Sequence, residues 1–164
     1  MVRKSDSDRM YMKMAFEAAA LSHARRLKVG AILVVPEQGR FEGINGMPSG
    51  FDNNCEIEFI TKPEVLHAEA NAISKVARST SSSIGSTMYC TASPCVECAK
   101  LMIQVGVVRV VYANQYRLPD GIDLLRRAKI QVDYLPLESH NVVEDELTLQ
   151  DEGRHRDEED GWRY

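Results

Sequence analysis

The sequence predicts an α/β layered fold in which the strands of the second half of the chain pair in parallel. The apolar run at residues 29–35 (VGAILVV) is nearly continuous, which is typical of a strand buried on both faces. From residue 64 onward, predicted helices and strands alternate, as in folds where helices cover a parallel sheet. A length of 164 residues with 44% hydrophobic content suits one domain with its own core.

The first half of the chain is predicted to hold one helix followed by a hairpin. Within the helix, at residues 8–26, Met10, Met14, Ala18 and Leu21 recur at helical spacing and predict its buried face. The segments that follow are the strand at 29–35, a turn at 36–39, an antiparallel strand at 40–44 and a loop rich in Gly, Asn and Pro at 45–54.

The second half is predicted to hold three helices and three strands. Pro63 precedes the first of these helices, and Pro94 opens the second, since proline is favoured in a first helical turn. The predicted helices span residues 64–78, 94–105 and 120–129, and the predicted strands span residues 87–91, 107–112 and 130–135.

Charge and composition divide the chain into a domain at residues 1–140 and a charged, acidic tail at 141–164, expected to be solvated. The net charge of −4 disfavours a long nucleic-acid partner, which usually requires a basic surface. No apolar run is long enough to span a membrane, and the polar start does not resemble a secretory signal. We therefore expect a cytoplasmic protein, whose four cysteines are free thiols or metal ligands rather than disulfides.

Three side chains have the character and spacing of zinc ligands. His67 lies in the predicted start of one helix, and Cys95 and Cys98 lie in the predicted start of the next. The spacing i, i+3 places both sulfurs on one helix face, and the positive end of the helix favours thiolate. A catalytic zinc keeps three protein ligands and leaves a fourth position for water, so these three residues predict a catalytic zinc site.

Glu69 follows His67 by two residues and is predicted to move protons. Zinc lowers the pKa of a bound water, and a carboxylate beside it can take the proton and deliver it elsewhere, as deamination of a cytosine ring requires. His-x-Glu followed by Pro-Cys-x-x-Cys is the pattern of zinc deaminases. The alternatives are a structural zinc site, which normally has four protein ligands, and a redox dithiol, which leaves His67 and Glu69 without a role.

These motifs resemble the cytidine/deoxycytidylate deaminase superfamily and, more narrowly, the deoxycytidylate (dCMP) deaminases. The resemblance covers roughly residues 8–135 and is carried by residues 43–50 (GINGMPSG), 67–73 (HAEANAI) and 93–100 (SPCVECAK). It implies a three-layer α/β/α fold around a five-stranded mixed sheet. It also implies zinc held by His67, Cys95 and Cys98, and hydrolytic conversion of dCMP to dUMP and ammonia in pyrimidine deoxynucleotide biosynthesis. Deoxycytidine triphosphate (dCTP) is a second candidate substrate.

The resemblance also indicates residues that contact the nucleotide. Asn45 matches an asparagine that holds the deoxyribose or the base edge, the backbone of Ala68 is expected near the base, and Tyr116 matches a tyrosine that closes over the sugar and phosphate. Arg26 and Lys28 are candidate phosphate ligands because they enter the first strand. The alternatives are an ordinary turn at Asn45, a surface tyrosine and two solvated cations.

Regulation is a further implication of the resemblance. Many dCMP deaminases are hexamers activated by dCTP with magnesium and inhibited by dTTP, which makes residues 43–50 the candidate effector loop. The predicted effector contacts are Gly43, Gly46 and Met47, with Arg78 reaching a nucleotide across a subunit interface. Ile44 departs from the family, where tyrosine is usual, and this departure puts the regulation in question.

Three rival functions remain. A tRNA or single-stranded DNA deaminase shares the zinc motifs but needs a basic track for the strand. A deaminase of another small ring, such as guanine, has the same site chemistry. A zinc-stabilised module that binds nucleotides without turnover would not need Glu69. Separately, His23 and Cys55 suggest a second zinc site, although two ligands are too few for zinc.

Overall fold

The computed structural model describes residues 3–116 and 118–137, and its centre is a five-stranded mixed sheet. The helices are α1 (Lys4–Ala20), α2 (Ala68–Ala77), α3 (Val96–Gln104) and α4 (Asp120–Arg127). The strands are β1 (Gly30–Val35), β2 (Gly39–Ile44), β3 (Glu56–Ile57), β4 (Ile60–Thr61), β5 (Thr87–Ala92), β6 (Arg109–Asn114) and β7 (Gln131–Tyr134).

The order of the strands in the sheet is β2-β1-β5-β6-β7. Strand β1 pairs antiparallel with β2 on one side and with β5 on the other. Strands β5, β6 and β7 then run parallel to one another, with Tyr89 opposite Val111 in the β5–β6 pair. The predicted opening hairpin and the predicted parallel pairs late in the chain are both confirmed.

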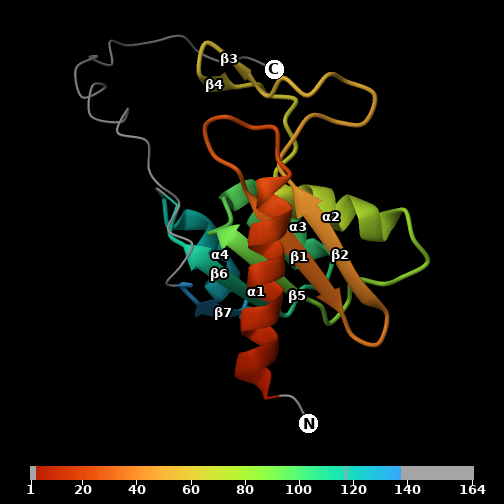
Figure 1. Ribbon diagram of the computed structural model, residues 1–164. Coiled ribbons are helices and arrows are strands. Elements are labelled where there is room, and N and C mark those ends of the chain that lie inside the picture. The colour runs from red at the N-terminus through yellow and green to blue at the C-terminus, as the bar shows by residue number, and fades with distance from the viewer. Residues whose placement is uncertain (1–2, 117, 138–164) are drawn as a thin grey trace, which may run out of the picture.

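Helices cover both faces of the sheet and make three layers (Figure 1). Because side chains alternate along a strand, Ala31 and Leu33 of β1 pack on one face with α2, α3 and α4, whereas Ile32 packs on the other face with α1. The same alternation separates Met88 from Tyr89 in β5. The predicted α/β/α fold is therefore confirmed, and it leaves the polar loops at the strand ends free to build a site.

Helix α1 differs from the prediction in its bounds and in its buried face. It runs from Lys4 to Ala20 rather than over residues 8–26. Met10 and Leu21, which were predicted to be buried, are exposed, and the buried residues are Met12, Ala15, Ala18 and Ala19. Small residues face the sheet because α1 approaches β1 so closely that a Cβ at Gly30 would overlap the carbonyl oxygen of Ala15.

The segment between β2 and α2 also differs from the prediction. The helix predicted at residues 64–78 begins only at Ala68, and the segment before it contains a short antiparallel hairpin, β3–β4, that was not predicted. Two-residue strands carry no periodicity, and their Ile57 and Ile60 are exposed. Figure 1 shows this hairpin standing apart from the main sheet.

Two further expectations concern the C-terminal tail and the absence of a membrane span. The predicted acidic tail at 141–164 lies outside the described residues. Within residues 3–116 and 118–137, every helix is too short or too polar to cross a lipid bilayer.

Candidate active site

The three predicted zinc ligands meet at the starts of two helices. His67 directly precedes α2, Cys95 directly precedes α3, and Cys98 lies in the first turn of α3. The sulfur atoms of Cys95 and Cys98 each lie 3.4 Å from Nδ1 of His67. The three candidate ligand atoms lie within 4.8 Å of one another, and they form the one such His/Cys/Asp/Glu group of three or more among the described residues.

Hydrogen bonds at the ends of β5 and β6 hold the loop that carries the cysteines. The Ser93 backbone N–H donates to the carbonyl of Asn114 at 2.8 Å, and the Asn114 side-chain amide donates to the carbonyl of Thr91 at 2.9 Å. The buried hydroxyl of Ser93 accepts the backbone N–H of Tyr116 at 2.7 Å. Sequence reasoning missed Ser93 and Asn114, although a polar residue at the end of each buried strand was a signal for them.

The pKa shifts in this cluster favour a thiolate at Cys95 and a protonated imidazole at His67. A hydrogen bond from Cys98 lowers the pKa of Cys95 far below the usual thiol range, and the contact with His67 lowers it further. The same hydrogen bond, together with burial, raises the pKa of Cys98. The hydrogen bond to Cys95 raises the pKa of His67 despite its partial burial. Soft sulfur and imidazole donors held this close have the chemistry of a zinc site.

The distances also suit zinc. With Zn–N near 2.05 Å and Zn–S near 2.3 Å, tetrahedral coordination separates nitrogen from sulfur by about 3.6 Å. The two separations of 3.4 Å are close to that value, so the residues present fit the ion. Three protein donors leave one tetrahedral position for solvent or substrate, which is the arrangement of a catalytic zinc site rather than a structural one.

Glu69 lies one residue into α2 and is 4% exposed. Burial is the largest influence on its carboxyl group and raises the pKa above the usual value for glutamate. A raised pKa brings a carboxyl group closer to the operating pH, which favours a role as general acid–base. The arrangement as a whole can hold a metal ion, activate water and transfer protons, with Glu69 and Cys98 buried and His67 exposed.

Residues 5–114 match the family described as the cytidine and deoxycytidylate deaminase zinc-binding region. The chain belongs to this family. It is 32% identical over 127 residues to the deoxycytidylate deaminase of Mycobacterium phage D29, a match that covers 68% of this chain and 98% of that protein. It is 44% identical over 88 residues to the deoxycytidylate deaminase of Enterobacteria phage T4, covering 52% of this chain and 45% of that protein. It thus spans about half the length of the T4 and T2 relatives.

A solved member of the family shares the fold. The crystal structure of dCMP deaminase from the cyanophage S-TIM5, in complex with dCMP and dUMP, matches with a TM-score of 0.78 and 44% identity. The match covers 82% of this chain and all of that chain. The family resemblance predicted from residues 43–50, 67–73 and 93–100 is therefore confirmed.

Asn45, a predicted substrate ligand, uses its side chain for hydrogen bonds within the protein that clamp two segments together. Its Oδ1 accepts the backbone N–H of Val29 at 2.8 Å and lies 2.7 Å from the Ser22 hydroxyl, while its Nδ2 donates to the carbonyl of Leu27 at 2.8 Å. These bonds tie the end of β2 to the segment that enters β1. An amide nitrogen carries two protons, so one N–H of Asn45 remains for a ligand beyond the bond to Leu27.

The other predicted nucleotide contacts differ from one another in their burial and in their hydrogen-bond partners. Ala68 is fully buried between His67 and Glu69, and the Tyr116 side chain is 42% exposed beside the loop that carries the cysteines. Arg26 lies 3.4 Å from the Thr61 hydroxyl, and Lys28 lies 3.4 Å from the carbonyl of Ala20. Both cations are exposed, and the length of these side-chain contacts leaves them able to reorient toward a phosphate.

The predicted effector residues do not form one cluster. Gly43 packs against the start of α2, Gly46 exchanges two backbone hydrogen bonds with Leu66, and Met47 packs in a small apolar cluster with Ala24, Cys55 and Val65. Arg78 follows the last turn of α2, about 16.5 Å along the helix axis from His67 at about 1.5 Å per residue. Arg78 therefore lies at the opposite end of α2 from His67 and from Leu66, the partner of Gly46.

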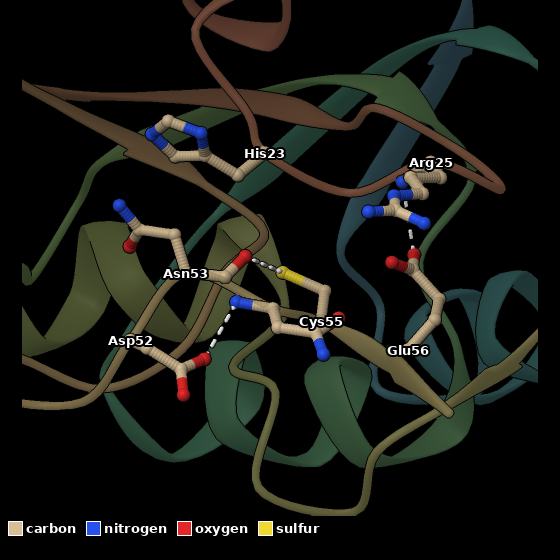
Figure 2. A pocket seen from close by; sticks show the side chains of 7 residues that line it. His23, Arg25, Asp52, Asn53, Cys55 and Glu56 are labelled. Atoms are coloured by element: carbon tan, nitrogen blue, oxygen red, sulfur yellow. Dashed lines mark hydrogen bonds between the residues drawn. The ribbon is translucent and has the colours of Figure 1, made fainter.

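A separate cavity of about 350 Å³ lies beside the loop that leads to β3 (Figure 2). Its lining includes His23 and Cys55, the two residues of the suggested second zinc site, but the thiol of Cys55 donates to the carbonyl of Asn53 at 3.5 Å. Glu56 accepts the backbone N–H of Arg25 at 2.9 Å. Among the described residues, His23 and Cys55 belong to no group of three ligand atoms close enough to share an ion.

Proposed function

We propose that this chain is a zinc-dependent hydrolase that converts dCMP to dUMP and ammonia. The observation that carries the proposal is the gathering of His67, Cys95 and Cys98 around one point beside the buried carboxyl group of Glu69. The family membership and the similarity to deoxycytidylate deaminases of phages D29 and S-TIM5 support the choice of substrate. dCTP is the second candidate substrate.

His67, Cys95 and Cys98 would hold the zinc ion. When bound, zinc supplies Lewis acidity that makes water nucleophilic near neutral pH. In the overall reaction, the oxygen of water forms a bond to C4 of the cytosine ring, the bond from C4 to the exocyclic nitrogen breaks, and ammonia leaves.

Glu69 would carry the protons between these partners. Its carboxylate takes a proton from the attacking water, delivers it to N3 of the ring and then assists departure of the amine. Burial raises the pKa of this carboxyl group, which favours the protonated form that delivers the proton to N3. The peptide of Ala68 lies between His67 and Glu69 and would contact the base edge.

The remaining contacts would recognise the rest of the nucleotide. The available amide N–H of Asn45 would donate to the deoxyribose, and Tyr116 would cover the sugar and phosphate from its exposed position. Arg26 and Lys28 would pair with the phosphate, since each is exposed at the segment that Asn45 clamps. Loss of charge at either cation is expected to raise KM more than it lowers kcat.

Regulation and assembly follow as parts of the same proposal. A homo-hexamer would let Arg78 of one subunit reach the loop of Gly43, Gly46 and Met47 in another, where dCTP with Mg²⁺ would activate and dTTP would inhibit. The enzyme would act in pyrimidine deoxynucleotide biosynthesis in the cytoplasm, where the thiols of Cys95 and Cys98 stay reduced. Residues 1–140 would form the catalytic domain, and residues 141–164 would form an acidic tail outside it.

The test is a substrate panel with the zinc-loaded protein. Absorbance assays of dCMP, dCTP, cytidine, cytosine, guanine and a single-stranded oligonucleotide, with and without dCTP, dTTP and Mg²⁺, separate the proposal from its rivals. dCMP should be the best substrate, followed by dCTP. Preferred turnover of the oligonucleotide or of guanine would replace the proposed substrate class, and nucleotide binding without any turnover would identify a binding module.

A single variant tests the mechanism. Glu69→Gln keeps the size and shape of the side chain but removes its proton transfer, so kcat should fall by about 10²- to 10⁴-fold. Zinc content and thermal unfolding should stay close to wild type. Normal turnover by this variant would exclude Glu69 as the proton carrier.

A further inference from the structure

Helix α4 lies against the backbone that presents the two cysteines. Gly121, in its first turn, is buried and lacks a side chain at the point of contact. A Cβ at this position would overlap the carbonyl oxygen of Pro94 and would lie 2.8 Å and 2.9 Å from the carbonyl carbon and oxygen of Cys95. Cβ contacts below 3.0 Å essentially do not occur in proteins, so even one methyl group would force one of the two segments to move.

Neither segment can move freely. Pro94 is fully buried, and the carbonyl of Cys95 accepts the N–H of Ala99 at 2.9 Å, which is the first hydrogen bond of α3. On the other side, Ile122 and Leu125 anchor α4 in the core, where they are 2% and 0% exposed. Moving α4 outward would expose two large apolar side chains, whereas moving Cys95 would break the start of the helix that carries both sulfurs.

We propose that Gly121 is a positioning residue for the metal centre: its missing side chain lets α4 hold the Pro94–Cys95 backbone where the sulfurs of Cys95 and Cys98 both meet His67. This inference rests on the proposed function only in taking these three residues as zinc ligands. The coupling is reciprocal by thermodynamic linkage, so binding of the ion must in turn stabilise the first turn of α4.

The chain offers a matched control in Gly30. A Cβ there would overlap the carbonyl oxygen of Ala15 and lie 2.6 Å from the backbone nitrogen of Ala19, but these atoms belong to α1 and not to the segments that carry the ligands. Gly30→Ala and Gly121→Ala therefore introduce the same methyl group against a helix or loop backbone. Both should lower stability, and only the second should disturb the metal.

The experiment compares metal binding by the folded wild-type and variant proteins. Zinc affinity is measured by competition with a chromophoric chelator, and Co²⁺ reports thiolate coordination through its sulfur-to-metal absorption. Loss of a group that orients metal ligands typically weakens binding by about 10- to 100-fold, which is the fall expected for Gly121→Ala, together with a weakened Co²⁺–thiolate band. Gly30→Ala should retain wild-type affinity and spectrum.

A second measurement needs no substitution and decides the matter if Gly121→Ala does not fold. Amide hydrogen exchange of the wild-type protein is compared before and after zinc is removed and restored. Zinc should protect the amides of Asp123 and its neighbours in α4 and should leave those of α1 near Ala15 unchanged. Equal exchange in α4 with and without zinc, or an unaltered affinity and spectrum in Gly121→Ala, would overturn the proposal.

The outcome is independent of the substrate. Zinc binding and exchange require no turnover, so the role of Gly121 can hold even if dCMP is not deaminated. Absence of zinc binding in the wild-type protein would instead overturn both the proposed function and the role of Gly121.

Discussion

Two clusters of ionisable groups lie at the two ends of β6, and they differ in how their charges are stabilised. At its start, Arg109 makes two hydrogen bonds to the carboxylate of Asp8, at 2.7 Å and 2.8 Å, and one to Asp133, while the Tyr89 hydroxyl donates to Asp8. At its end, Asn114 holds the loop that leads to the cysteines. In the first cluster two carboxylates share one guanidinium, whereas in the second two thiols, an imidazole and a buried carboxyl group lie together.

The direction of the pKa shifts expresses this difference. The Arg109 guanidinium lowers the pKa of Asp8 and is itself held in its charged form, so the first cluster favours the ions that it already contains. In the second cluster, burial raises the pKa of Glu69 and a shared hydrogen bond raises the pKa of Cys98, which disfavours the ionised forms of these two groups. The first cluster stabilises the ions that it contains, whereas the perturbed pKa values of the second are typical of a functional site.

The largest expected effect comes from removing a sulfur. Cys98→Ala should abolish deamination and reduce zinc from about one ion per chain toward none, because two protein ligands do not hold a catalytic zinc. Metal analysis and the dCMP assay measure both effects. Cys90→Ala is the matched control, since Cys90 is buried in β5 but is not one of the three clustered ligands. Equal zinc loss in both variants would show that burial of the thiol, and not coordination, is what matters.

The second expected effect concerns the cluster of Asp8, Arg109 and Asp133 at the start of β6. Arg109→Met should lower the free energy of unfolding by about 2 to 3 kcal/mol, because it removes the guanidinium bonded to Asp8 and Asp133, whose side chains are 13% and 35% exposed. Zinc content and kcat of the folded protein should be unchanged. Denaturant unfolding provides the measurement, and Arg126→Met is the control, since its pair with Asp123 is exposed and 3.8 Å long. That control should change stability by less than about 0.5 kcal/mol.

The contrast between the clusters also explains what the sequence could reveal. His67, Cys95 and Cys98 were predicted to converge because zinc requires particular ligand types and because the three residues lie at predicted helix starts. Both signals are local in the sequence. The pair Asp8–Arg109 was not predicted, since a salt bridge across 101 positions has no local signal. The contact of Gly121 with the Pro94 carbonyl escaped prediction for the same reason, because a glycine in a helix looks like a weak helix residue until its neighbour is known.

The smallest expected effect is the pH dependence of the stability that Asp8 contributes in acid. Because the folded state lowers the pKa of Asp8, this carboxylate stabilises the protein above its unfolded pKa of about 3.9, and the contribution disappears as pH falls toward the folded value. The free energy of unfolding of the wild type should therefore decline more steeply below about pH 4 than that of Asp8→Asn, although the variant is less stable at neutral pH. Release of zinc in acid affects both proteins, so the difference between their curves isolates Asp8. Parallel curves would mean that the bonds from Arg109 and Tyr89 do not distinguish the ionised carboxylate, and the cluster would then hold α1 to the sheet by packing alone.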